Sequence, residues 1–186
     1  MNQQEVKVSL RQIEQTDAGT IRNLSGSPFR NLLEFPMPAS LSATEDWIST
    51  SQSDPDSRFF IITAAKGNTN TYAVGLCGLA KIDWPAKHAS LFFAMIDKDK
   101  YRSSIQTHPS TRAALGRLIR YGFKELGLNR LYIEIAEHNE SRPSLEDAGF
   151  VVEGVRQAAV FLDHKMRATL LLSITATEYE AKCSAS

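Results

Sequence analysis

Several features that mark specialised protein classes are absent from this 186-residue sequence. No apolar run approaches the roughly 20 residues that a helix needs to cross a bilayer, and the first residues, MNQQE, lack the basic-then-apolar order of a secretion signal. Lys and Arg balance Asp and Glu at 21 each, so the formal net charge is zero. Because dedicated nucleic-acid binders usually carry a basic surplus, this balance argues against that class. We expect no membrane and no nucleic-acid partner, with the cytoplasm as the default location.

Cysteine is equally scarce, since only Cys77 and Cys183 occur and neither belongs to a CxxC pair. That spacing argues against a disulfide framework and against a zinc site. The histidines show no metal-ligand spacing either, so we predict no metal site. Cys77 lies in an apolar run and is expected to be a small core residue.

What remains is the composition of an ordinary globular domain, with 42% apolar and 23% charged residues. We expect a single domain over residues 1–186, with a mobile tail over about residues 180–186. Alternating and apolar runs predict about seven strands, over residues 6–13, 58–66, 72–82, 88–96, 131–136, 151–162 and 166–175. Helical patterns fall over residues 18–24, 44–51, 109–126 and 143–148. This order predicts an α+β fold around a mixed, mostly antiparallel sheet flanked by helices.

The most regular segment is the helix expected over residues 109–126. Its apolar residues recur at helical spacing and form one stripe: Ala114, Leu115, Leu118, Ile119, Phe123 and Leu126. Pro109 suits a first helical position, and Gly127 suits the position just past the end.

The sequence that continues from this helix carries a family signature. From Leu115 to Phe150 it reads LGRLIRYGFKELGLNRLYIEIAEHNESRPSLEDAGF. The signature consists of RYGF at the end of the helix, then LGLNR, a strand ending at Asn139, AGF at residues 148–150, and the pair Glu153-Gly154. In this order and spacing the segment resembles the GNAT superfamily, and within it the Rim-type ribosomal-protein N-acetyltransferases and their small-molecule relatives. The N-terminal piece VSLRQIEQTDA matches the same branch.

The resemblance implies the GNAT acyl-CoA N-acyltransferase fold, with acetyl-CoA as co-substrate. In that fold two parallel strands, here residues 88–96 and 131–136, splay apart and expose backbone groups that pair with the pantetheine arm. The pyrophosphate lies at the N-terminus of the long helix, where free N–H groups and the helix dipole favour an anion. By this mapping we expect the cofactor to contact Met95, Ile96, Gln106, Thr107, His108, Ser110, Thr111, Arg112 and Asn139.

Two positions depart from the family pattern. The phosphate loop usually carries small residues where this sequence has Thr107 and Pro109, and glycine there lets the backbone approach phosphate. Nearby groups could compensate, namely the hydroxyls of Thr107, Ser110 and Thr111 and the cations Lys98, Lys100, Arg102 and Arg112. Leu145 replaces the tyrosine that many family members use as proton donor. We therefore expect Ser141 or Ser144 to orient the acetyl group or protonate the thiolate, although Ser144 could equally be a helix-cap residue.

Acetyl transfer also needs a group that removes a proton from the attacking amine. The family's usual glutamate is missing from strand 88–96, which leaves His88 at its start and Glu134 on the facing strand, acting through water. Each has a simpler interpretation that we favour on sequence alone, His88 as an exposed turn residue and Glu134 as a solvent-facing strand residue. Candidates for the acceptor site are the acids Glu34 and Asp83 and the aromatics Phe29, Phe35, Trp47 and Trp84.

The sequence therefore predicts an acetyl-CoA-dependent N-acetyltransferase in which a primary amine attacks the thioester directly in a ternary complex. The acceptor is a small molecule or a protein N-terminus, and the sequence does not choose between them. A different class stays open: a GNAT-fold binding or regulatory protein without catalysis, which the glycine-poor loop and the missing tyrosine would suit. An unrelated α+β module would require the ordered motifs to be coincidental. The C-terminal hairpin could supply the edge of a homodimer.

Overall fold

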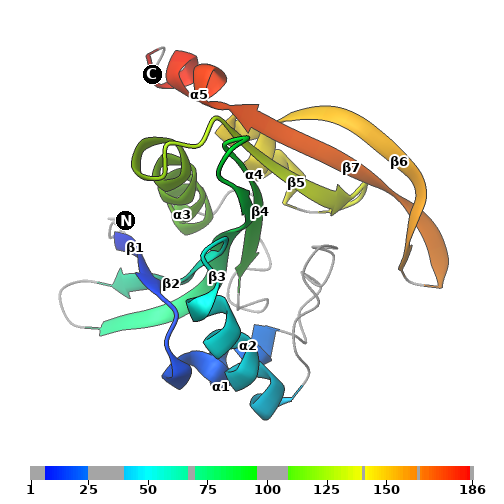
Figure 1. The fold of residues 1–186 in the computed structure, drawn as a ribbon. Coiled ribbons are helices and arrows are strands. Elements are labelled where there is room, and N and C mark those ends of the chain that lie inside the picture. The colour runs from blue at the N-terminus through cyan, green and yellow to red at the C-terminus, as the bar shows by residue number, and fades with distance from the viewer. Residues whose placement is uncertain are drawn as a thin grey trace, which may run out of the picture.

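A single seven-stranded sheet organises the computed structural model, which describes residues 7–24, 40–66, 70–95, 109–139, 141–162 and 164–184. The strand order is β1-β2-β3-β4-β5-β7-β6, and every neighbouring pair is antiparallel except β4 and β5. The strands are β1 (Lys7–Gln12), β2 (Arg58–Lys66), β3 (Asn70–Asp83), β4 (His88–Met95), β5 (Arg130–Ala136), β6 (Val151–Leu162) and β7 (Lys165–Thr175). The predicted mixed, mostly antiparallel sheet is confirmed, and Figure 1 shows its strong twist.

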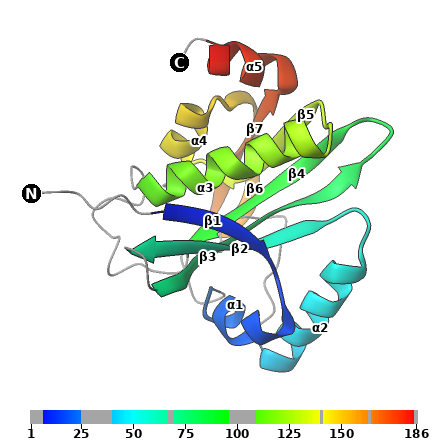
Figure 2. The same cartoon turned by 90° about the vertical axis from the view of Figure 1, so that its left-hand side faces the viewer.

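Helices pack on both faces of this sheet. They are η1 (Gln15–Asp17), α1 (Ala18–Leu24), α2 (Leu41–Ser53), α3 (Pro109–Arg120), the π-helical turn η3 (Tyr121–Glu125), α4 (Arg142–Ala148) and α5 (Ala176–Ser184). Two neighbouring residues of β2 identify the faces, because successive side chains of a strand point to opposite sides. Phe59 contacts Trp47 of α2, at 4.9 Å between ring centroids, and Phe60 contacts Tyr121 of η3 at 5.1 Å. Figure 2 shows α1 and α2 below the sheet and α3 across its other face.

The core fills both sides of the central strands. From Ala89 to Met95 every residue of β4 is buried, and so is Cys77 of β3, as its apolar surroundings predicted. Gly75 of β3 is required by close packing, because a Cβ there would lie 2.6 Å from the main-chain oxygen of Ala94. The glycine therefore lets β3 approach the end of β4.

Two expected boundaries need correction. The second helix begins at Leu41 rather than near Thr44, because the hydroxyl of Ser40 accepts a hydrogen bond from the N–H of Ala43 at 3.1 Å and caps the helix. The segment expected to be a mobile tail contains a helix, since α5 extends to Ser184.

The ring of Tyr179 in α5 lies 5.2 Å from the ring of Phe123, so the C-terminal helix packs on the turn that ends the long helix. None of the helices in the described ranges is long and apolar enough to span a membrane.

Candidate active site

The two central parallel strands separate soon after they begin. Strands β4 and β5 pair at only three positions, His88 with Arg130, Ala89 with Leu131 and Ser90 with Tyr132. Beyond Ser90, β4 stays paired with β3 as far as Met95, while β5 stays paired with β7 as far as Ala136. Each strand thus keeps its other neighbour while the gap between them widens (Figure 1). The predicted splay is confirmed, and the main-chain groups of β4 that face it have no strand partner in the described part of the chain.

Buried polar side chains gather on the two elements that flank this opening. Ser110 and Thr111 lie in the first turn of α3, Asn139 lies in the connection from β5 to α4, and Ser144 lies in the first turn of α4; all four are buried. The hydroxyl of Thr111 has no hydrogen-bond partner among the residues that the structure describes. Because a buried hydroxyl without a partner is costly, this group indicates a position where a ligand could accept or donate a hydrogen bond.

The charge at the start of α3 also suits an anion. The first turn of α3 carries no acidic residue, so the N-terminal end of its dipole is not neutralised by a carboxylate. Arg112 extends from this turn and pairs with Asp147 of α4, with 2.8 Å between Nη2 and Oδ2. Both side chains are exposed, so the pair is weak and could open when a phosphate approaches.

Asn139 shapes the corner between β5 and α4. Its Oδ1 accepts a hydrogen bond from the N–H of Ser141 at 2.8 Å, and its carbonyl oxygen accepts one from the N–H of Arg142 at 3.1 Å. Ser141 occupies the N-cap position of α4, but its side chain makes no capping hydrogen bond there. Ser144 lies inside the first turn and is buried. Both predicted serines therefore lie at the start of α4, the helix that follows β5 in the chain.

His88 lies at the end of the sheet where β4 and β5 are still paired. Its Nε2 is 3.8 Å from Oδ2 of Asp83, and its ring meets that of Tyr132 edge-on at 5.8 Å. Its Nδ1 is buried and finds no hydrogen-bond partner in the described ranges. The expectation of an exposed turn residue is wrong, because the ring is half-buried against β5.

Glu134 projects from β5 just past the last residue that pairs with β4. Its carboxylate is only 11% exposed and accepts hydrogen bonds from the hydroxyl of Thr169 and from Nη1 of Arg156. It is therefore not the simple solvent-facing residue that the sequence favoured. Thr169 in β7 and Arg156 in β6 were missed by sequence reasoning, because only the pairing of β5, β7 and β6 brings them together.

The remaining predicted residues fall into two groups. Met95 ends β4 in the core, Trp47 packs on Phe59, and the indole N–H of Trp84 donates to Asp56 at 2.8 Å. The others lie outside the described residues: Phe29, Glu34, Phe35, Ile96, Lys98, Lys100, Arg102, Gln106, Thr107 and His108.

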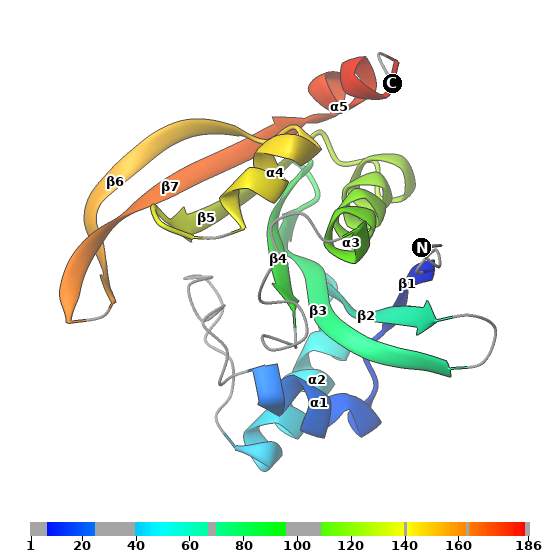
Figure 3. The same cartoon turned by 180° about the vertical axis from the view of Figure 1, so that it is seen from behind.

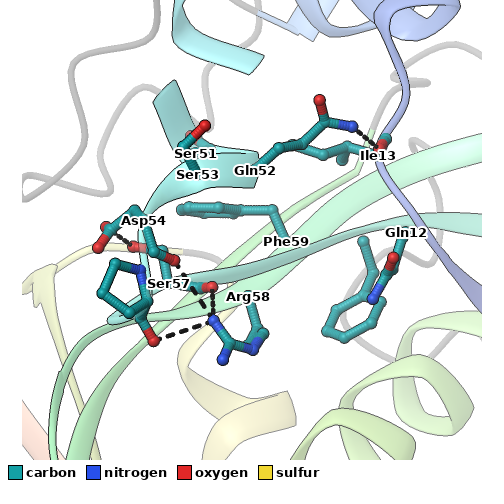
Figure 4. Close-up of a pocket in the computed structure, with 11 residues that line it drawn as sticks. Gln12, Ile13, Ser51, Gln52, Ser53, Asp54, Ser57, Arg58 and Phe59 are labelled. Carbon is teal, nitrogen blue, oxygen red and sulfur yellow. Dashed lines mark hydrogen bonds between the residues drawn. The ribbon is translucent and has the colours of Figure 1, made fainter. Parts of the chain in front are cut away.

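Two surface hollows lie away from the opening. One of about 400 Å³ lies between the end of α2 and the start of β2, over Phe59 (Figure 4). There Arg58 donates to the carbonyl oxygens of Pro55 and Ser57 at 3.0 and 2.6 Å, which stabilises the turn. The other, of about 600 Å³, lies between β1 and the helix formed by α3 and η3. Neither is lined by the buried polar residues beside the splayed strands.

A splayed parallel pair beside a helix start is what the family resemblance implied. Comparison with known proteins supports that family assignment. The model of the acetyltransferase (GNAT) domain matches residues 7–151. The chain belongs to the GNAT acetyltransferase family. Members of this family generally use acetyl-CoA, and the homology supports an N-acetyltransferase.

Individual relatives agree on the fold. The spermidine N(1)-acetyltransferase of Vibrio cholerae is 27% identical over 177 residues, which cover 93% of this chain and 95% of the relative. A crystal structure of mutant forms of the spermidine/spermine N-acetyltransferase SpeG from Vibrio cholerae superposes with a TM-score of 0.78 at 23% identity, covering 98% and 99% of the two chains. The same enzyme in complex with manganese ions gives 0.76 at 23% identity, covering 95% and 96%. The predicted GNAT fold is confirmed, whereas membership of the Rim-type branch stays a prediction.

Proposed function

We propose that this protein transfers the acetyl group of acetyl-CoA to a primary amine of an aliphatic polyamine such as spermidine. The observation that carries the proposal is the opening between β4 and β5, which lies beside a helix start where the buried hydroxyl of Thr111 has no hydrogen-bond partner among the described residues. A co-substrate with a phosphate at one end and a peptide-like arm at the other suits both features, because phosphate prefers helix N-termini and amides pair with free strand edges.

The residues present fit acetyl-CoA at this opening. The pyrophosphate would meet the first turn of α3, with the hydroxyls of Ser110 and Thr111 and the guanidinium of Arg112 as partners. Gln106, Thr107 and His108 precede this turn in the sequence, and we propose that they complete the phosphate site. Met95 and Ile96 would contribute main-chain groups to the pantetheine arm and to the thioester oxygen. Asn139, whose Oδ1 holds the turn, would donate to the arm through its side-chain NH₂.

The amine must lose a proton as its nitrogen attacks the thioester carbon and the carbon–sulfur bond breaks. Glu134 lies past the point of separation and carries a carboxylate, so we propose that it attracts the ammonium and receives its proton through water. His88 is the alternative base, although it lies at the paired end of the strands. Ser141 or Ser144 would return a proton to the thiolate from the opposite side, at the start of α4.

The polyamine acceptor rests on the spermidine N(1)-acetyltransferase of Vibrio cholerae, which is similar along nearly its whole length. The Rim-type resemblance favours a protein N-terminus instead. We therefore propose to measure CoA release with spermidine, spermine and an alanine-initiated peptide as parallel acceptors. Release with the polyamines and a matching mass gain of one acetyl group would support the proposal. Release with the peptide alone would select the Rim-type function, and acetyl-CoA binding without release from any amine would select a regulatory role.

We also propose that the protein forms a homodimer through the β6–β7 hairpin, which projects from the body of the molecule (Figure 3). The hairpin carries exposed apolar side chains: Val151, Val152, Val155, Phe161 and Met166. Strand β6 is also the edge of the sheet, which favours pairing with another chain. Light scattering should give twice the mass of the 20.7 kDa chain, and substitution of Phe161 by Ser should shift the mass towards one chain.

A further inference from the structure

Two ion pairs link β5 to β6 on the same face of the sheet, and they differ in character. Arg130 and Glu134 are four residues apart on β5, so their side chains project to the same side. In the pair of Arg130 with Glu153 both side chains are about equally exposed, at 35% and 32%. In the pair of Glu134 with Arg156 the carboxylate is 11% exposed and the guanidinium 69%. The first pair is a symmetrical surface contact, whereas in the second an exposed cation covers a nearly buried acid.

The two ion pairs also differ in the geometry of their hydrogen bonds. Arg130 uses both Nη1 and Nη2 on the two oxygens of Glu153, which is the strong bidentate arrangement. Arg156 presents only Nη1 to Glu134, at 3.1 Å from Oε1 and 2.9 Å from Oε2. One nitrogen that bridges both oxygens is the contact that a primary ammonium can make, because an ammonium has a single nitrogen with three N–H donors.

From this geometry we infer that Arg156 occupies the position on Glu134 that a cationic nitrogen of the acceptor takes when it binds. The inference rests on the proposed function and deepens it: Arg156 is a positioning residue that competes with the substrate. The hydroxyl of Thr169, which donates to Oε1 of Glu134 at 2.5 Å, would keep the carboxylate in place while the two cations exchange.

The exchange is physically reasonable because it never leaves the carboxylate unpaired. The side chain of Glu134 is only 11% exposed, and in the free protein the guanidinium of Arg156 is the cation that faces it. The guanidinium of Arg156 is already 69% exposed, so it gives up little contact with the protein when it returns fully to water. Arg156 also precedes a break in the pairing of β6 with β7, which resumes at Val160, so its strand is less constrained there.

Arg167 provides a control for general electrostatics. It lies on β7 two residues before Thr169, so it adds positive charge on the same face, and no hydrogen bond joins it to Glu134 in the described structure. Removing its charge should relieve only long-range repulsion of a cationic acceptor, whereas removing Arg156 should also free the carboxylate. The pair of Arg130 with Glu153 provides the second control, since it is a cross-strand contact that the inference assigns no role.

The test is calorimetric binding of spermidine, without acetyl-CoA turnover, to the full chain and to single substitutions. We expect Arg156→Gln to lower the Kd for spermidine about fivefold, because the competing cation is mostly exposed and its removal frees the carboxylate for the acceptor. Arg156→Lys should stay close to the parent, because it restores a competing cation. We expect Glu134→Gln to raise the Kd about tenfold, and Glu134→Gln combined with Arg156→Gln to show no gain over Glu134→Gln alone. Arg130→Gln should leave the Kd unchanged.

Three results would overturn the inference: an unchanged Kd for Arg156→Gln, an equal gain for Arg167→Gln, or no spermidine binding to any variant. Failure of the proposed function gives a different pattern, since CoA release is measured separately. If CoA is released with another amine while spermidine does not bind, the acetyltransferase activity stands and the competition by Arg156 is wrong. If Arg156→Gln binds spermidine more tightly but no amine yields CoA, the cation site stands and the transfer activity is wrong. Acetyl-CoA affinity should be the same in all variants, which separates competition at Glu134 from a general loss of structure.

Discussion

The hydroxyl of Thr111 is the most informative single group to remove. It is buried in the first turn of α3 and has no hydrogen-bond partner within the described ranges. Valine has nearly the same shape and lacks the hydroxyl, so Thr111→Val removes a buried polar group without opening a cavity. Leaving such a group unpaired costs about 1–3 kcal/mol. We therefore expect Thr111→Val to raise the free energy of unfolding of the ligand-free protein by about 1 kcal/mol.

The same substitution should weaken cofactor binding, because the proposed site uses this hydroxyl on the pyrophosphate. A hydrogen bond to a charged group contributes about 1.5–3 kcal/mol, so the Kd for CoA should rise at least about tenfold. Thermal unfolding with and without CoA measures both effects in one assay. For a domain of this size 1 kcal/mol shifts Tm by about 2–4 °C. The variant should therefore melt higher than the parent without CoA and gain less from saturating CoA.

Thr44 supplies a matched control in another helix. It is fully buried in the first turn of α2, but its hydroxyl donates to the carbonyl oxygen of Ser40 at 2.7 Å. Thr44→Val should lower Tm without CoA and leave the gain from CoA unchanged, because it breaks a satisfied bond far from the cofactor. If Thr111→Val behaves like Thr44→Val, the hydroxyl of Thr111 is satisfied within the protein and the proposed phosphate site is wrong.

Three further predictions concern stability and reactivity. Burial acts to raise the pKa of Asp17, but hydrogen bonds from Arg11 and from a main-chain N–H outweigh it and hold that pKa below its usual value. Because the pKa of Asp17 is lower in the folded protein, its ionised form stabilises the fold above the pKa of the unfolded chain, and this stabilisation is lost as pH falls through the folded pKa. Asp17→Asn should therefore lower the free energy of unfolding by about 1–3 kcal/mol at pH 7 and flatten the acid limb of the unfolding curves. Gly75→Ala should lower stability by more than about 1 kcal/mol in urea titrations, because its Cβ would lie 2.6 Å from a main-chain oxygen of β4; unchanged stability would contradict this close packing. Burial raises the pKa of the Cys77 thiol while Cys183 is exposed, so a thiol reagent should modify one cysteine in the native protein and two in urea.

The sequence predicted the strands well because their signals are local. Runs such as RFFIITAAK and HASLFFAMI are apolar and β-branched or aromatic, and they became β2 and β4 almost to the residue. The opening between β4 and β5 was also predictable, but only through the family resemblance, since no pattern within either strand states which neighbour it leaves.

The C-terminal helix was missed although one local signal was present. Thr175 and Glu178 have the spacing of a capping box, and Glu178 accepts a hydrogen bond from the N–H of Thr175 at 2.8 Å. The polar composition of the segment obscured it, because few apolar residues mark a buried face. Its packing depends on Phe123, more than 50 residues away in the chain, and that contact has no sequence signature.

The partners of Glu134 could not be predicted at all. Thr169 and Arg156 meet it because β7 lies between β5 and β6 in the sheet, so strands distant in sequence become neighbours. Sequence reasoning placed Glu134 as a candidate base with a simpler alternative, and neither description includes a cation held on its carboxylate. Such contacts depend on register, which propensity does not specify.

A crystal structure of the protein with CoA tests the central claim most directly. We expect the pyrophosphate at the first turn of α3, within hydrogen-bond distance of the Thr111 hydroxyl, and the pantetheine arm between β4 and β5. The sulfur atom of CoA should lie within the opening, between Glu134 and the start of α4. Phosphate bound elsewhere, or a pantetheine arm that does not enter between the two strands, would contradict the account.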